Sequence, residues 1–253
     1  MRKIGWRTFS LFAAAFILAL LATAPATLLS GVVESVSNGR LILANAGGTV
    51  WQGNATPAIR RKEGSLMALE KLHWDVSLLS FFTGKISVAL RWAGIEQAQP
   101  MVVVFSAGQI EARNAVIPLP AAVLGELSPL LQPAQLSGNI LITSEQFSYS
   151  GNGISGKAIA DWMNAGSVLS AVNPLGSYQV SIAGRGRQLD VSLMTVSGAL
   201  LLEGNGNYAP DTGLKFQATA RSSSERSDGL KELLSNFGPE SAPGVHTLNL
   251  MSK

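Results

Sequence analysis

The chain has 253 residues, with 19 basic and 16 acidic side chains, a formal net charge of +3 and no cysteine. The lack of cysteine excludes disulfides, thiolate metal sites, iron–sulfur clusters and cysteine nucleophiles. The excess positive charge equals Arg2, Lys3 and Arg7, and every acidic residue lies at Glu34 or beyond. The rest of the chain is formally neutral, which argues against nucleic acid as a partner, because nucleic-acid binding needs a clustered basic surface.

An apolar run over residues 9–29 follows these basic residues, and only small or weakly polar residues and Pro25 interrupt it. About 20 mostly apolar residues suffice for a transmembrane helix, and basic residues that flank a span tend to stay in the cytoplasm. The sequence therefore predicts a cytoplasmic tail over residues 1–8, a transmembrane anchor over residues 9–29 and an exported domain over residues 30–253.

A cleaved signal peptide is the alternative to this anchor, since signal peptides also combine a basic start with an apolar stretch that ends at small residues. Ala22-Thr23-Ala24 provides such a cleavage site, although Pro25 directly after it disfavours cleavage. Ala24-Pro25-Ala26 provides a second, weaker site. Both alternatives export the same domain.

Short segments follow in which apolar and polar residues alternate, and this period of two is typical of strands with one buried face. The clearest segments are residues 72–76, 85–92, 136–142, 155–162, 178–183, 189–193, 199–202 and 214–220, with apolar runs at 101–105 and 110–116 and a last candidate at 245–250. Together with 26 glycines, these segments predict a mainly β domain.

Two short helices are predicted within this β pattern. Prolines flank residues 121–127 on both sides, which indicates a helix because proline is tolerated at a helix start and prevents a helix from continuing. Residues 228–238 place leucines and Phe237 at helical spacing on one face, and Gly238 is a natural end.

Glycines mark several candidate turns. Residues 151–156 match the Gly-x-Gly-x-x-Gly dinucleotide pattern, but strand-like segments flank them on both sides, which favours a hairpin. Gly204-Asn205-Gly206-Asn207 is predicted to be another hairpin loop. Three apolar–Ser–Gly units beside predicted strands indicate either repeated strands or ordinary turns: Leu136-Ser137-Gly138, Ile154-Ser155-Gly156 and Val196-Ser197-Gly198.

The sequence offers no recognisable set of side chains for catalysis. The two histidines, His73 and His246, have no neighbours at the spacing of a catalytic pair or a metal site. A Gly-x-Ser-x-Gly nucleophile motif is absent. We therefore expect a protein that is not an enzyme, without catalytic residues, cofactor or metal.

Trp51, Trp74 and Trp92 are the candidate contact residues, each in a separate predicted strand. Aromatic side chains on one sheet face usually form core, but they also line partner-binding faces or apolar grooves. If Trp51 is core, Trp51→Ala is expected to destabilise the domain by roughly 3–5 kcal/mol. If function fails while stability is unchanged, Trp51 is a contact residue instead.

The basic start, the apolar run and Leu41-Ile42-Leu43 before Gly48-Thr49-Val50-Trp51-Gln52-Gly53 resemble the general secretion pathway protein N family of the type II secretion system. Leu72-His73-Trp74, Leu136-Ser137-Gly138 and the predicted helix over residues 228–238 also fit the family pattern. The resemblance covers nearly the whole chain, and Gly-Thr-Val-Trp-Gln-Gly is its most specific motif.

This resemblance implies a single-pass protein of the inner membrane of a Gram-negative cell, with a cytoplasmic N-terminus and a periplasmic domain over residues 30–253. The family is a non-enzymatic accessory part of the inner-membrane platform that exports folded proteins, so other platform proteins are the implied partners. A distant similarity to AsmA-like proteins implies a long curved antiparallel sheet. Because such sheets cradle lipid, a lipid-binding or lipid-transfer groove is the alternative function, with lipid contact at the three tryptophans.

Overall fold

The computed structural model describes residues 6–96, 99–128, 131–223 and 228–252, so Arg2 and Lys3 of the predicted tail lie outside the described residues. The strands are β1 (Leu41–Gly48), β2 (Gln52–Arg60), β3 (Leu66–Ala68), β4 (Leu72–Ser77), β5 (Ile86–Trp92), β6 (Met101–Ser106), β7 (Gln109–Pro120), β8 (Ser137–Ser150), β9 (Gly153–Gly166), β10 (Gly176–Gly186), β11 (Gln188–Gly198), β12 (Leu200–Ala209), β13 (Gly213–Ser222), β14 (Glu240–Ala242) and β15 (Val245–Ser252). The helices are α1 (Trp6–Ala22), α2 (Thr27–Val36), α3 (Val123–Leu127) and α4 (Lys231–Phe237), with 3₁₀-helices η1 (Leu78–Thr83), η2 (Gln132–Ala134) and η3 (Asp228–Leu230).

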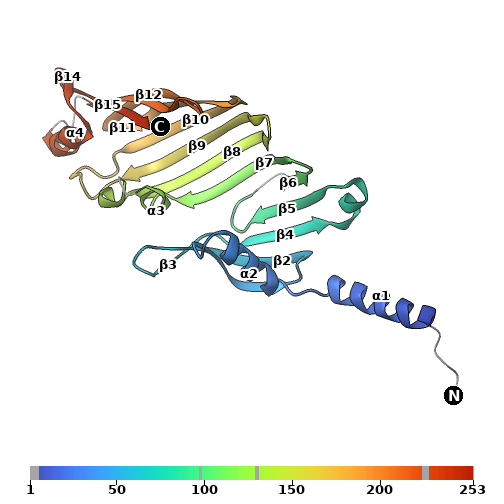
Figure 1. Cartoon of the computed structure of the whole chain (residues 1–253). Coiled ribbons are helices and arrows are strands. Elements are labelled where there is room, and N and C mark those ends of the chain that lie inside the picture. Colours follow the sequence, from blue (N-terminus) through green and yellow to red (C-terminus); the bar gives the residue numbers. More distant parts are fainter. Residues whose placement is uncertain (1–5, 97–98, 129–130, 224–227, 253) are drawn as a thin grey trace.

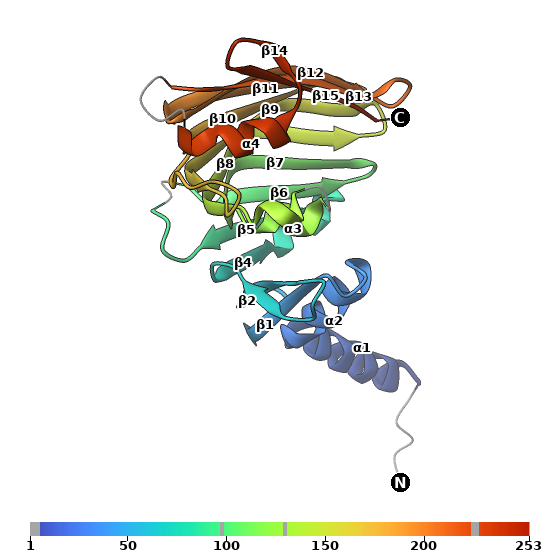
Figure 2. The same ribbon diagram turned by 90° about the vertical axis from the view of Figure 1, so that its left-hand side faces the viewer.

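These strands form one antiparallel sheet in which nearly every strand pairs with the next one in the sequence. The order is β1-β2-β4-β5-β6-β7-β8-β9-β10-β11-β12-β13-β15-β14, with β3 beside β2. Figures 1 and 2 show the strands stacked from β2, close to α1 and α2, to β15 at the far end. The prediction of a mainly β fold on a long antiparallel sheet is confirmed.

The prediction of an N-terminal transmembrane helix over residues 9–29 is wrong. Within the described part of the chain, no helix is both long enough and apolar enough to cross a membrane. α1 ends before Pro25, which has no N–H for a helical bond, and the backbone there turns to the sheet instead. The Ala26 N–H donates to the Gly48 carbonyl oxygen (3.0 Å), and the Val50 N–H donates to the Ala24 carbonyl oxygen (2.9 Å).

The sheet has an apolar face and a polar face. Directly paired residues of neighbouring antiparallel strands point to the same side, so each face can be followed from pair to pair. On the apolar face, Trp74 pairs with Leu90, and Leu90 pairs with Met101. Further members of this face are Phe105, Ile110, Ile117, Ile142, Tyr149, Trp162, Tyr178, Ile182, Leu193, Leu202, Phe216, Ala220 and Leu250. Polar side chains such as Asp190, Asn205, Lys215 and Asn249 occupy the other face.

A helix covers the apolar face at the N-terminal end of the sheet. Ala26 precedes α2 and forms one buried cluster with Ala55 and Trp74, and Leu29 of α2 packs against it. α2 carries no charged residue before Glu34, so its first two turns can lie on an apolar surface. α2 lies mainly against β1, where the Ser30 hydroxyl donates to the Leu43 carbonyl oxygen (3.1 Å), and Leu29 reaches the cluster on β2 and β4.

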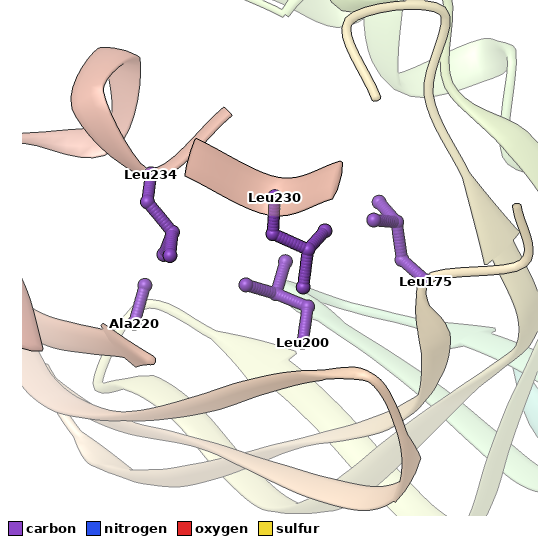
Figure 3. Packing of buried hydrophobic residues seen from close by; sticks show 5 residues of the cluster. All are labelled: Leu175, Leu200, Ala220, Leu230 and Leu234. Carbon is purple, nitrogen blue, oxygen red and sulfur yellow. The ribbon is translucent and has the colours of Figure 1, made fainter. Parts of the chain in front are cut away.

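A second helical segment covers the apolar face at the C-terminal end. Leu230 and Leu234, in η3 and α4, point at Leu200 and Ala220 of the sheet, as Figure 3 shows. Leu175 completes the cluster, and all five side chains are at most 5% exposed. The predicted helix over residues 228–238 is thereby confirmed, as is the short helix within residues 121–127.

Two glycine predictions have different outcomes. Residues 151–156 form the hairpin between β8 and β9, as predicted, with Ser150 paired to Gly153. The predicted loop over residues 204–207 is wrong, because these residues lie inside β12. Position 204 requires glycine because the Phe216 ring lies across it, and a Cβ at Gly204 would lie 2.8 Å from the ring.

The glycines of the three apolar–Ser–Gly units share a positive φ at or beside shifts in strand register, which marks bulges.

Tyr178 gives a pH-dependent prediction for the core. Its buried hydroxyl donates to the Leu200 carbonyl oxygen (3.0 Å), and burial raises the pKa of Tyr178 above its ordinary value of 10.0. The unfolded chain then loses this proton at a lower pH than the folded chain. The stability from Tyr178 is therefore complete below about pH 10 and falls as the pH rises further. We expect Tyr178→Phe to show a weaker alkaline loss of unfolding free energy than the unmodified chain, measured by urea unfolding. Equal losses would contradict this.

Candidate functional site

The Gly-Thr-Val-Trp-Gln-Gly motif forms the turn between β1 and β2 and holds the segment between α1 and α2. We call this turn, residues 48–53, the clasp. Pro25 forms a bridge to Thr49, beside the two backbone bonds described above. The Thr49 N–H donates to the Gln52 carbonyl oxygen (2.9 Å), and its hydroxyl accepts the Gln52 N–H (3.1 Å). Gly48 has φ +87°, and a Cβ there would lie 2.5 Å from the Gln52 oxygen, so the turn requires glycine.

Trp51 lies in the clasp and not in a strand, which corrects its predicted position. Its side chain is half-buried, and its indole N–H donates to the Leu21 carbonyl oxygen in the last turn of α1 (2.7 Å). Its ring meets the ring of Phe81 in η1 edge to face, with the centroids 6.0 Å apart. The Val76 N–H donates to the Trp51 carbonyl oxygen (2.6 Å). Trp51 therefore joins α1, η1 and β4 at one point.

Trp74 supports the clasp from the apolar face. Only 7% of its surface is exposed, and its indole N–H donates to the Thr49 carbonyl oxygen (3.3 Å). The indole lies across Gly53, where a Cβ would come within 2.6 Å of the ring atom Cζ2. The clasp thus has a glycine at each end, and the second makes room for a core tryptophan. Trp74 is a core residue and has little surface for a partner.

Trp92 lies on the same face, where it pairs with Leu72, and is half-buried. Its indole nitrogen is buried without a hydrogen-bond partner. Trp74 and Trp92 therefore share a sheet face while Trp51 lies at its end, so the three tryptophans do not form a single row along it.

The indole N–H groups of Trp74 and Trp92 predict different responses to phenylalanine. Trp92→Phe removes a buried donor that has no acceptor, so we expect a change of less than about 1 kcal/mol in the free energy of unfolding. Trp74→Phe loses the bond to Thr49 and leaves that carbonyl unpaired, so we expect it to cost about 1–3 kcal/mol. Urea unfolding of both variants measures the difference. A larger loss for Trp92→Phe would contradict the assignment.

In the described residues, no group of three or more His, Asp or Glu side chains could hold a metal ion. The side chain of Arg113 donates to Glu111 (2.6 Å), and this bond holds the pKa of the Glu111 carboxyl below its ordinary value. Three surface hollows lie along the sheet, and none has Trp51, Trp74 or Trp92 in its lining.

The fold and the clasp define a mainly β protein with one long antiparallel sheet, joined at one end to an exposed apolar helix. A family model described as type II secretion system (T2SS), protein N, matches residues 39–249, and the chain belongs to this family. The family is a secretion-system component and is not known as an enzyme family. Membership implies contact with other components of the system and a membrane-associated location. No curated protein and no solved structure gives a significant match.

Proposed function

We propose that this chain is a non-enzymatic accessory subunit of the inner-membrane platform of the type II secretion system. The family match over residues 39–249 carries this proposal, because it includes the clasp and almost the whole sheet. In this role the sheet domain lies in the periplasm, at the inner membrane of a Gram-negative cell. It supports the export of folded proteins through contacts with other platform proteins.

The geometry of the clasp suggests how the chain performs such a role. A subunit without a catalytic centre acts by holding other parts in position, which requires a rigid link between its elements. Trp51 and the backbone of residues 24–26 provide that link between the end of α1 and the sheet. We propose that Trp51 serves the assembly through this link, whereas Trp74 supports the fold.

The lipid-groove alternative stays a prediction. It expects the tryptophan strands to line a cavity, and the three hollows have other linings. The hollow across β10 to β15 mixes polar side chains such as Asp190 and Lys215 with apolar ones such as Phe216, whereas the hollow lined by Ile95, Leu119, Ile140 and their neighbours is mainly apolar. A groove for acyl chains needs a mainly apolar wall. Extraction of the purified chain followed by mass spectrometry of lipids tests this alternative directly.

Cross-linking in cells tests the proposed role. A tagged full chain, expressed at its native level and cross-linked before membrane extraction, is expected to carry other platform proteins through purification. Deletion of its gene is expected to leave folded type II substrates in the periplasm and to deplete them from the medium. Normal secretion after deletion, together with no platform protein in the cross-linked sample, would overturn the proposal.

A further inference from the structure

The connection between β4 and β5 exposes a run of large apolar side chains. We call residues 78–83, which form η1, the apolar loop. Leu79 and Phe82 are 77% and 90% exposed, and Leu78 and Phe81 are 54% and 44% exposed. Contiguous exposed apolar surface on this scale marks a site that contacts a protein or a membrane.

The polar groups of the apolar loop are bonded within the connection. The Ser80 hydroxyl donates to the Ser77 carbonyl oxygen (2.6 Å) and accepts the Ser87 N–H (3.1 Å). The Thr83 hydroxyl donates to the Ser80 carbonyl oxygen (2.7 Å). The connection is therefore braced by its own hydroxyl groups, and the side chains that it presents outward are apolar.

A row of apolar residues on the sheet continues the surface of the loop. We call Ile86, Phe105, Ile110 and Tyr149 the apolar row, because each is paired directly with the next across β5, β6, β7 and β8. Their exposed fractions are 41%, 41%, 44% and 58%. In Figure 1 the β4–β5 connection lies on the side of the sheet from which α1 projects.

The end of α1 meets the same surface, and two of its last carbonyl groups accept hydrogen bonds from the chain itself. The Leu21 carbonyl oxygen accepts the indole N–H of Trp51, and the Ala19 carbonyl oxygen accepts both the N–H and the hydroxyl of Thr23 (3.0 and 2.8 Å). In hydrocarbon such groups must find partners within the protein, because no water is present. The side chains around α1 are apolar and exposed: Trp6, Phe9, Leu11, Phe12, Phe16, Ile17, Leu18, Leu20 and Leu21.

We propose that the apolar loop and the apolar row lie against the surface of a lipid bilayer, with the clasp holding the end of α1 at that surface. Lipid is the occupant because the exposed surface is continuous, through the Trp51–Phe81 contact, with a helix that exposes many large apolar side chains. Tyr149 and Trp51 are the residue types that favour the membrane interface, and the exposed Lys85 between loop and row can reach headgroups. This contact does not depend on the proposed role in secretion.

The cysteine-free chain allows a direct test with single labelled cysteines. The full chain carrying Phe82→Cys or Ile110→Cys is labelled with the fluorophore NBD and reconstituted into vesicles of phosphatidylethanolamine and phosphatidylglycerol. Leu66→Cys is the matched control, since Leu66 is also apolar and 53% exposed but lies in β3, on the opposite side of the sheet in Figure 1. Lipids with a nitroxide near the headgroup quench only fluorophores at that depth.

We expect blue-shifted emission and at least about twofold stronger quenching at positions 82 and 110 than at position 66. A label at Thr83→Cys is expected to lose its quenching when Leu79 and Phe82 are both replaced by glutamate, because charges there resist contact with lipid. Blue-shifted emission without nitroxide quenching would mean that a protein or a second copy covers the surface, and this would overturn the proposal. Emission typical of water at positions 82 and 110 would overturn it as well.

Discussion

Trp74→Ala is expected to lower the free energy of unfolding by about 3–5 kcal/mol, because it empties a nearly closed space in the core. The indole packs in one cluster with Ala26 and Ala55, and its N–H donates to the clasp at Thr49. Its loss removes the support of the clasp and of the start of α2 together. Urea unfolding of the full chain in detergent, followed by circular dichroism of the sheet, measures the change.

Trp51→Ala is the matched control for this variant. Trp51 is half-buried, and its contacts are one hydrogen bond and one ring edge, so we expect a loss below about 2 kcal/mol. This expected loss is smaller than the loss expected if Trp51 were a core residue, because its side chain is only half-buried. If Trp74→Ala costs no more than Trp51→Ala, then Trp74 does not support the clasp.

Leu230→Ala is expected to be the most damaging change at the opposite end of the sheet, with a loss of about 2–5 kcal/mol. Leu230 has no exposed surface, and its cluster with Leu175, Leu200 and Ala220 holds the helical segment on the sheet. The variant is expected to detach η3 and α4, so that limited proteolysis cuts within residues 228–238 sooner. Leu127→Ala, at a leucine that is 72% exposed, is the control and is expected to leave both readouts unchanged. Equal unfolding curves for the two variants would contradict the packing in Figure 3.

The strands and two helices could be predicted because their signals are local. Alternation with period two is a property of neighbouring residues, and the division into an apolar and a polar face follows from it directly. The helical segment from Leu230 to Phe237 could also be predicted, since the helical spacing of its apolar residues and the terminal glycine lie within a few residues of each other. The local signals were misleading at residues 204–207, where the glycines predicted a loop. Gly204 instead makes room in the sheet for the ring of Phe216, which lies on another strand.

The break after α1 could not be predicted from hydropathy. The run over residues 9–29 is apolar throughout, but the chain turns after Thr23 because Ala24 and Ala26 bond to the backbone of residues 48–50. Those partners are more than twenty residues away, and no local window contains them. Pro25 was the one nearby signal, and it marked the position where the helix ends.

The position of Trp51 was missed for a related reason. Tryptophan has a high propensity for strands, and the prediction relied on this propensity rather than on the glycines at both ends of the motif. Those two glycines were the available signal: Gly48 needs a positive φ, and Gly53 makes room for Trp74. Two glycines with these steric requirements on either side of a tryptophan indicate a turn rather than a strand, and here the turn joins α1 to the sheet.

The most direct test of this account is secretion by cells that carry Trp51→Ala in place of the unmodified chain. We predict that folded type II substrates fall in the medium and rise in the periplasm, while the cellular level of the variant stays near that of the unmodified chain and its free energy of unfolding falls by less than about 2 kcal/mol. Trp92→Phe is expected to secrete normally, because its N–H has no partner to lose. Normal secretion by Trp51→Ala, at an unchanged protein level, would contradict the central claim that the clasp serves the secretion assembly.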